Sequence, residues 1–579
     1  MKLHVVCLIV LALGTASPVG GEETRFVVMG ARTSDPVEGI FDAVVDEISL
    51  LQPDFVINVG NLIEVQGADS SNIHAQWFDV KNTLAILNCA KYFVPGSNDI
   101  SDDITRTIFE KETGRKRYYS FDKGNCHFVV LDNSMNAWAP MPEVDTLQYA
   151  WLVSDLERNK HVDHIFIFFN TPFYLTALSS GQPSAFVDLC LEYRVRAVFN
   201  GGIGSYMYLN EDGIDYIAVG SSGAAMRDHD MGKGNFYHYL FVTVKEDEYN
   251  VAVIKHGSVF YRNVFTGSDY YSVQRAQQEV VSMIGTMVRE GEKNVSSSCR
   301  MTVSNTSTDS ISGPIAWQFD STRYSIIPAI IPLALGAEES STCDIKVQIF
   351  DGSHLFPLPR CALEYPYAFD KVCTLNTMLS IKRVKAVELM DEPPEIDGSL
   401  ADSAWQRLTP IKYLGDDFGM PSSMEGTDLY LGHDRMNVYI GVRSHERDLS
   451  NVRARVAQRD GPTYTDDNIW FFFDVNHDER TYYQLIVNPN GFAFDRACSV
   501  DEGRINTDVA WNGPWEIENG REQDSWVLEI KIPKDAFAER NDERWGLNFR
   551  RLQTGSASAA YWTLPFGHSP ANFGIIEFE

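Results

Sequence analysis

The feature that most constrains the fold of this chain of 579 residues is a change in its hydrophobic periodicity along the sequence. Over about residues 23–265, short apolar runs such as 25–29 and 54–59 alternate with stretches whose apolar residues recur at helical spacing. This alternation predicts a sheet covered by helices. After about residue 292, apolar and polar residues alternate with a period of two, as in 526–532. That period is typical of half-buried antiparallel strands. We therefore predict a multidomain fold with one α/β domain and two all-β sandwich domains.

The domain boundaries are placed where the pattern changes. Val273, Ala276, Val280, Ile284 and Met287 recur at helical spacing and predict a helical linker. The predicted segments are a signal peptide at 1–17, the α/β domain at 22–265, the helical linker at 266–291, a small β-sandwich at 292–380 and a second β-sandwich at 384–579.

The first residues carry a targeting pattern. Lys2 precedes an apolar run from Val5 to Leu13, and small residues follow at 14–17. A basic start, a short apolar stretch and a small-residue exit predict a secretory signal peptide. The apolar run is shorter than the roughly 20 residues that span a membrane. We therefore expect an exported protein, secreted or periplasmic, without a membrane span.

Charge and cysteine content narrow the partners further. The chain has 49 Lys+Arg against 79 Asp+Glu, a net charge of −30, which argues against nucleic acid as a partner. Cys299, Cys343, Cys361 and Cys373 fall in one region, where one or two disulfides are expected in an oxidising compartment. Their connectivity is left open. No Cys-x-x-Cys pair occurs, so a structural zinc site is not expected.

Short polar segments follow the predicted strands of the first domain. They read Gly30-Ala31-Arg32-Thr33, Gly60-Asn61-Leu62, Pro95-Gly96-Ser97-Asn98-Asp99, Asn170-Thr171-Pro172 and Asn200-Gly201-Gly202-Ile203-Gly204. Functional groups of α/β folds lie at such strand ends. The spacing, with the flanking strings PDFVINVGNLIE, YFVPGSND and RYYSFD, resembles the calcineurin-like metallophosphoesterases over about 240 residues. The resemblance implies β-sheets flanked by helices, a dinuclear metal centre and hydrolysis of phosphate esters.

The sequence departs from that family at the positions that would hold the metals. The family has Asp-x-His, Gly-Asp, Gly-Asn-His-Asp, a lone His and Gly-His-x-His at these strand ends. Asp99 alone keeps the family's residue, and the substituted positions are Ala31, Thr33, Asn61, Ser97, Asn98, Asn170, Gly202 and Gly204. Two cations about 3.5–4 Å apart need bridging carboxylates and imidazoles, which these side chains do not supply.

We therefore predict a pseudoenzyme domain without a catalytic residue or a metal cofactor. Two interpretations of its asparagines stay open. They line a neutral polar pocket that binds a small ligand, or they preserve the shape and hydrogen bonds of a decayed site.

The last domain carries a second set of motifs. PEIDG at 394–398, DDNIW at 466–470, WVLEIKIP, WGLNFRR and NFG at 572–574 occur in an order that resembles the family 9 carbohydrate-binding module. The resemblance implies that a sugar is held between two aromatic faces, which correspond by position to Tyr464 and Trp562. Trp470 stands where the family has a glutamate, and Arg550, Trp511 and Trp515 are further candidates.

A weaker motif lies between two predicted strands of this domain. Asp474, Asn476 and Asp478 form a D-x-N-x-D run whose alternating oxygen ligands suit calcium. The run has neither the glycine nor the terminal glutamate of an EF-hand loop. A structural calcium site and a solvated turn are the two interpretations.

Together these patterns predict an exported pseudo-phosphoesterase that binds carbohydrate or a protein partner. Two alternatives remain, an unconventional extracellular hydrolase acting on phosphorylated or glycan substrates in carbohydrate catabolism, and a structural envelope scaffold. The strong negative charge and the missing cations favour a neutral glycan over an anionic substrate.

Overall fold

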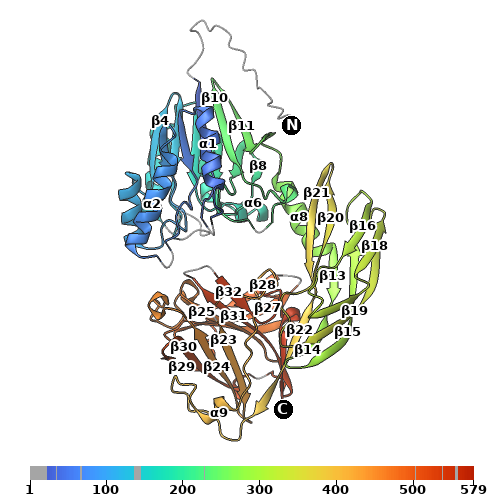
Figure 1. The fold of residues 1–579 in the computed structure, drawn as a ribbon. Helices are drawn as coiled ribbons and strands as arrows, with labels where there is room; N and C mark the ends of the chain where they lie inside the picture. Colours follow the sequence, from blue (N-terminus) through green and yellow to red (C-terminus); the bar gives the residue numbers. More distant parts are fainter. Residues whose placement is uncertain are drawn as a thin grey trace, which may run out of the picture. The chain divides into compact units, whose positions relative to one another are not determined.

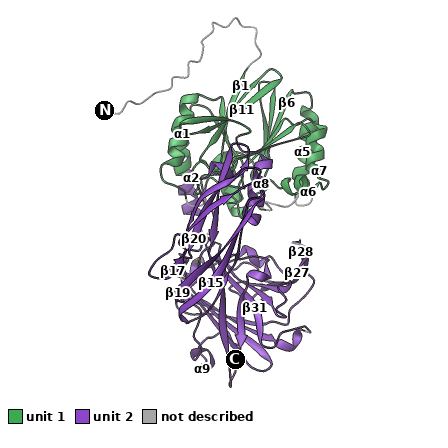
Figure 2. Ribbon diagram, turned by 90° about the vertical axis from the view of Figure 1, so that its right-hand side faces the viewer, with its two compact units in different colours: residues 1–62, 78–226, 236–264 green, residues 63–77, 227–235, 265–579 purple. Residues whose placement is uncertain are grey.

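The structure is a computed structural model that describes residues 23–33, 36–65, 68–135, 145–226, 228–424, 426–501, 504–537, 539–554 and 558–579. The predicted signal peptide lies outside these residues. The chain forms two compact units, one of residues 1–62, 78–226 and 236–264 and one of residues 63–77, 227–235 and 265–579 (Figure 2). Among the described helices, none is long and apolar enough to cross a membrane.

The first unit contains two six-stranded sheets. One sheet has the order β12-β11-β10-β1-β2-β3 and the other β4-β5-β6-β7-β9-β8. Their strands are β1 (Thr24–Met29), β2 (Phe55–Asn58), β3 (Ala90–Phe93), β4 (Tyr119–Lys123), β5 (Cys126–Val130), β6 (His164–Phe169), β7 (Ala197–Asn200), β8 (Met207–Glu211), β9 (Ile214–Ala218), β10 (Tyr239–Lys245), β11 (Glu248–Lys255) and β12 (Ser258–Tyr261).

Aromatic rings join the two sheets. Phe26 of β1 stacks on Phe55 of β2, with ring centroids 5.0 Å apart, and meets Phe128 of β5 edge-on at 5.3 Å. The helices lie on the outer faces, with α1 on one flank and α5 and α7 on the other (Figure 2). The helices are α1 (Ile40–Leu51), α2 (Ser70–Leu84), α3 (Asp103–Thr113), α5 (Thr146–Asn159), α6 (Leu175–Ser180) and α7 (Ala185–Glu192). The predicted sheet-and-helix architecture is confirmed.

From residue 265 onward, the second unit consists of α8 (Gly267–Glu279) followed by a β-rich region (Figure 1). A four-stranded sheet β13-β15-β19-β17 is accompanied by the pairs β16–β18 and β20–β21. The strands are β13 (Val281–Ile284), β14 (Thr286–Arg289), β15 (Lys293–Ser304), β16 (Ile311–Ala316), β17 (Tyr324–Ile327), β18 (Ile330–Leu335), β19 (Ser340–Asp351), β20 (Arg360–Ala368) and β21 (Lys371–Met378).

Two predictions for this region are wrong. The helical linker ends at Glu279, and Ile284 and Met287 lie in strands with 69% and 62% of their surface exposed. Their spacing also fits strands, so the helical periodicity was misleading there. The expected disulfides are absent, since all eight described cysteines are free. In the β20–β21 hairpin, Cys361 pairs with Thr377 and Cys373 pairs with Tyr365, which separates the two thiols along the strands.

The remaining residues form the second sandwich. Its sheets meet at β22, which pairs in parallel with β14, β33 and β23. The elements are β22 (Ile381–Leu389), α9 (Ser403–Gln406), β23 (Thr427–His433), β24 (Asn437–His445), β25 (Asn468–Asp474), β26 (Thr481–Val487), β27 (Ala493–Asp501), β28 (Arg504–Asp508), β29 (Glu516–Arg521), β30 (Ser525–Pro533), β31 (Arg544–Gln553), β32 (Ser558–Tyr561) and β33 (Gly574–Phe578). Ile469, Phe471 and Phe549 belong to the buried core between the sheets.

Candidate functional site

The strand ends of the first unit bring Thr33, Asn61 and Asn98 together. Asn61 has a φ of 63° just after β2, and its main-chain oxygen accepts hydrogen bonds from the amide and hydroxyl of Thr33, both at 3.0 Å. The Asn61 side-chain oxygen accepts from the Asn98 amide at 3.0 Å. The Asn98 side chain donates to the Thr33 hydroxyl at 3.4 Å. These three substituted positions form one hydrogen-bonded cluster, which we call the strand-end cluster.

Asp99 holds this cluster in place. Its carboxylate is 1% exposed and accepts main-chain N–H groups from Asn61 at 2.7 Å, Leu62 at 2.8 Å and Gly96 at 2.9 Å. Hydrogen bonds from several N–H groups stabilise the negative charge of a buried carboxylate. The only acid retained from the family pattern is thus occupied in fixing two loops.

Asn170 joins the cluster from β6. Its side chain donates to the Val59 carbonyl at 2.8 Å and accepts from the Ser97 amide at 3.4 Å. Gly202 has a φ of 78°, and a Cβ there would lie 2.9 Å from the Thr171 Cα. A histidine at Gly202 therefore does not fit this backbone. Gly204 faces open space, and Ala31 contributes main-chain hydrogen bonds with Gly220, Ser222 and Ala224.

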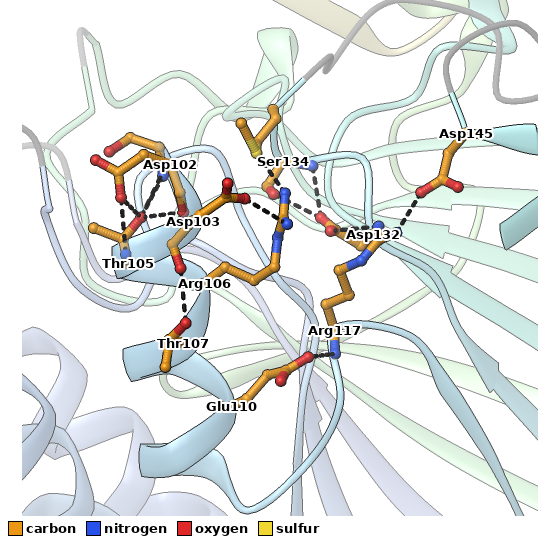
Figure 3. Close-up of polar contacts among 12 residues, drawn as sticks. Asp102, Asp103, Thr105, Arg106, Thr107, Glu110, Arg117, Asp132, Ser134 and Asp145 are labelled. Carbon is orange, nitrogen blue, oxygen red and sulfur yellow. Dashed lines mark hydrogen bonds and ion pairs between the residues drawn. The ribbon is translucent and has the colours of Figure 1, made fainter. Parts of the chain in front are cut away.

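Sequence reasoning missed the loop after β5, which extends this network. Asn133 donates to the Thr171 carbonyl at 2.6 Å and accepts from the Thr171 amide at 3.2 Å. Figure 3 shows Arg117 between two carboxylates next to this loop, at 3.0 Å from Asp132 and 2.6 Å from Asp145. Burial disfavours the guanidinium charge, but the hydrogen bonds and charges of the two carboxylates outweigh it and raise the pKa of Arg117.

The chemistry of these donors does not suit a dinuclear metal centre. Among the described residues, no group of three or more His, Cys, Asp and Glu side chains is placed to hold a metal ion. Carboxamides are neutral, and those of Asn61, Asn98 and Asn170 already bond to neighbouring loops. The arrangement fixes loops in place through the hydrogen bonds of Thr33, Asn61, Asn98 and Asn170.

On the side of its sheet that faces away from the core, the second sandwich holds a smaller buried cluster of Phe472, Tyr482, Cys498 and Phe573, against which Trp470 and Phe566 pack. Strand alternation places Trp470, Phe472, Gln484 and Arg550 on this side, because Ile469, Phe471 and Phe549 point into the core. We call this surface the outer face. Trp470 lies directly opposite Arg550, whose guanidinium carbon is 4.7 Å from the indole centroid.

Four nitrogen donors on the outer face have no hydrogen-bond partner in the described part of the chain. They are Trp470 Nε1, Gln484 Nε2, Asn548 Nδ2 and Arg550 Nε. The neighbouring strand adds Arg496, which donates to the Gln484 side-chain oxygen and lies 3.3 Å from His568 Nε2. Burial and the positive charge of Arg496 lower the pKa of His568 to about 4. Burial also lowers the pKa of Arg550, against the opposing charges of Tyr561 and Asp417.

The predicted sugar-binding aromatics separate into two groups. Tyr464 is 49% exposed and meets Phe494 of β27 edge-on at 6.0 Å, so it stands beside the outer face. Trp562 is fully buried, and its indole N–H donates to Glu290 at 3.0 Å. Trp562 has no exposed ring for stacking in this structure, which corrects its assignment as half of a clamp.

Trp511 and Trp515 also belong to the core side of the sheet. Trp515 is 8% exposed and donates its indole N–H to the buried Asp495 carboxylate. Trp511 is partly buried against the same core. The outer-face residues that sequence reasoning missed are Phe494, Arg496, Gln484, Asn548 and His568. The signal that finds the first four is the strand alternation counted outward from Trp470.

The D-x-N-x-D segment forms the turn between β25 and β26. The Asp474 carboxylate accepts main-chain N–H groups of Asp478 at 3.2 Å and Glu479 at 3.0 Å. Asp478 accepts from the amides of Arg480 and Thr481, both at 2.7 Å. These carboxylates are engaged by main-chain N–H groups of their own turn, and the Asp474 side chain is fully buried.

Comparison with known proteins gave matches among solved structures only. No protein-family model and no curated protein sequence matches the chain. A family 9 carbohydrate-binding module from Caldicellulosiruptor kristjanssonii in complex with glucose is 16% identical, covers 34% of this chain and 96% of its own, and has a TM-score of 0.25. A dimetal phosphatase from Danio rerio is 11% identical, covers 41% and 98%, and has a TM-score of 0.31.

A third similar structure is the anchor in the inner membrane complex of Plasmodium, 13% identical, with 41% of this chain and 88% of its own covered and a TM-score of 0.32. Both kinds of fold that the sequence resembles are thus among the similar solved structures. Likeness at these identities concerns the fold alone, and TM-scores this low give no support to a function.

Proposed function

We propose that this protein is an exported carbohydrate-binding protein whose first unit is a non-catalytic frame. The observation that carries the proposal is the outer face, where the half-buried rings of Trp470 and Phe494 lie among four buried nitrogen donors without partners. Pyranose rings pack their C–H groups on aromatic faces, and their hydroxyls accept from amide, indole and guanidinium N–H groups. The outer face places both kinds of group on one sheet.

The strand-end cluster supports the non-catalytic half of the proposal. Its carboxamides bond to main-chain groups and to the Thr33 hydroxyl, and the Asp99 carboxylate accepts three main-chain N–H groups. Buried polar groups that are fully paired inside the protein have little to offer a ligand. The hydrolase alternative needs a metal or another activating group from elsewhere, and no cluster of three or more His, Cys, Asp and Glu among the described residues is placed to hold a metal ion.

A glycan array probed with the full-length chain tests the binding function. We expect binding of at least one oligosaccharide class, and Tyr464→Ala is expected to weaken it about tenfold by removing a stacking face. Tyr271→Ala is the matched control, because Tyr271 is 47% exposed on α8 and stands outside the outer face. An empty array, or equal binding by both variants and the parent chain, would overturn the proposal.

A further inference from the structure

The first unit contains a cavity of about 450 Å³ between the edge strands of its two sheets. Tyr208 lies on β8, an edge strand of one sheet, and Tyr261 ends β12, an edge strand of the other. The residues that line the cavity are Tyr208, Asn250, Val251, Tyr261, Arg262 and Asn263. These described residues do not include any member of the strand-end cluster. Ligand pockets measure about 300–1,000 Å³ and carry a few convergent polar groups, so this cavity suits a small ligand.

Asp215 of β9 holds two of the lining side chains in place. Its buried carboxylate accepts a hydrogen bond from the Tyr208 hydroxyl at 2.9 Å and pairs with Arg262 at 3.1 Å. The side chains of Asn210 and Tyr249 also donate to this carboxylate. The guanidinium carbon of Arg262 lies 5.5 Å from the ring centroid of Tyr208 and 5.6 Å from that of Tyr249. Ion pairing and ring contacts therefore fix the orientation of Arg262 before any ligand binds.

The charge of this cavity is balanced. Arg262 is the only charged residue among the described lining residues, and Asp215 supplies its counter-charge. The Arg262 side chain is still 38% exposed, so its guanidinium group remains open to a ligand. An anion gains little from an arginine that is already paired, in a chain with a net charge of −30. The cavity therefore favours a neutral ligand with many hydrogen-bonding groups.

The remaining lining residues are accessible. Tyr261 is 87% exposed, so its ring offers a flat face to a ligand, and Val251 adds a buried apolar surface. Asn250 and Asn263 are exposed, and their side chains make no hydrogen bond within the described part of the chain. A carboxamide both donates and accepts hydrogen bonds, as a sugar hydroxyl does. Aromatic faces beside free carboxamides and a guanidinium group can hold a pyranose ring by its C–H groups and its hydroxyls.

We infer that this cavity is a second carbohydrate-binding site, which takes a neutral oligosaccharide. The sugar ring packs on Tyr261, and its hydroxyls bond to the carboxamides of Asn250 and Asn263 and to the guanidinium group of Arg262. The site uses no residue of the outer face. The inference thus goes beyond the proposed function and gives the non-catalytic first unit a binding role of its own.

Hydroxyl-radical footprinting of the full-length chain locates the bound sugar. The probes are millimolar cellotetraose, maltotetraose and mannotetraose, with tetragalacturonate as the acidic counterpart. We expect at least one neutral probe to slow the oxidation of Tyr261 by about twofold or more, because a stacked sugar shields the ring from solvent. Tyr271 is 47% exposed on α8, outside the cavity, and its oxidation rate should not change.

Variants then test the residues of the cavity by titration calorimetry. All are made in the Tyr464→Ala chain, so that binding at the outer face does not mask the second site. Tyr261→Ala is expected to weaken binding of the protecting probe about tenfold. Val259→Ala is the matched control, because Val259 is 60% exposed on the same strand and is not among the lining residues. Asn263→Ala gives a second test if Tyr261→Ala fails to fold, as judged by thermal unfolding.

The outcomes separate this inference from the proposed function. Protection of Tyr464 without protection of Tyr261 overturns the inference and leaves sugar binding at the outer face standing. Equal affinities of the Tyr261→Ala and Val259→Ala chains also overturn it, as does protection of Tyr261 by tetragalacturonate alone. Protection of Tyr261 by a neutral probe, with loss of binding in Tyr261→Ala, supports the inference even if the outer face binds no glycan.

Discussion

The strand-end cluster of the first unit and the outer face of the second sandwich are both rich in carboxamides, yet they differ in how these are paired. Around Asn61, Asn98 and Asn170, each side chain bonds to a neighbouring loop. On the outer face, Gln484 and Asn548 each leave a buried N–H without a partner. Native proteins pair nearly all buried polar groups, so unpaired donors indicate a place where a ligand or ordered water completes the network. Residue type alone does not identify a site.

The largest expected effect is a loss of stability at the strand-end cluster, whose side chains are paired within the protein. Asp99→Ala leaves three buried main-chain N–H groups without their acceptor, and each unsatisfied group costs about 1–3 kcal/mol. We expect the free energy of unfolding of the first unit to fall by about 3 kcal/mol or more, measured by urea denaturation. Asp103→Ala is the control, since the Asp103 side chain is 87% exposed, and it should change stability by less than about 0.5 kcal/mol. Similar curves for both variants would contradict the structural role of Asp99.

A second pair of substitutions compares the two regions directly. Asn170→Leu breaks a buried hydrogen bond to Val59 and strands its carbonyl, and we expect a loss of about 2 kcal/mol. Asn548→Leu removes a donor that has no partner and also the acceptor of a 2.8 Å hydrogen bond from the Phe549 main-chain N–H, and we expect a smaller loss of about 1 kcal/mol. Denaturant unfolding of both variants, with the glycan array for Asn548→Leu, checks the expectation. Equal losses of stability at the two positions would show that the carboxamides of the outer face are as fully paired as those of the strand-end cluster.

The sequence predicts the fold better than the outer face. Strand and helix periods give the sheets, and the motif order gives both resemblances, because hydrophobic periodicity depends on local spacing. It fails where one spacing fits two structures, as at Ile284 and Met287. Trp562 was misassigned because a tryptophan near the chain's end suits a core as well as a ligand. Only strand register reveals that Trp470 lies opposite Arg550 and Gln484 opposite Arg496, because pairing joins residues far apart in sequence.

Two histidines, one in each of the compared units, are expected to make stability depend on pH in opposite directions. Buried His127 lies 2.6 Å from Asp122 and 3.0 Å from Asp155, and these hydrogen bonds and charges overcome burial to raise its pKa. A raised pKa gives stability below the unfolded value of about 6.5 that is lost as pH rises through the folded value. His568, beside Arg496, has its pKa lowered to about 4, so stability is lost as pH falls from about 6.5 towards 4.

NMR titration of the imidazole signals checks both directions. We expect His127 to titrate above 6.5 and His568 near 4, with His568→Gln removing the second midpoint and flattening the loss of stability in acid. A His568 that titrates near 6.5 in the free protein would contradict the burial of its ring beside Arg496.

The smallest expected effect is the response of the first unit to metal ions. Asn61 and Asn98 offer neutral amides already bonded within the cluster, and Gly202 offers no ligand atom. Millimolar Mn²⁺ or Zn²⁺ should therefore shift the unfolding midpoint of the full chain by less than about 1 °C, because a ligand stabilises only the state that binds it. Aryl-phosphate turnover should stay at the buffer rate. A chelator-sensitive shift that is lost in Asn98→Ala would show that the strand-end cluster binds a metal. The difference drawn between its paired side chains and the unpaired donors of the outer face would then not hold.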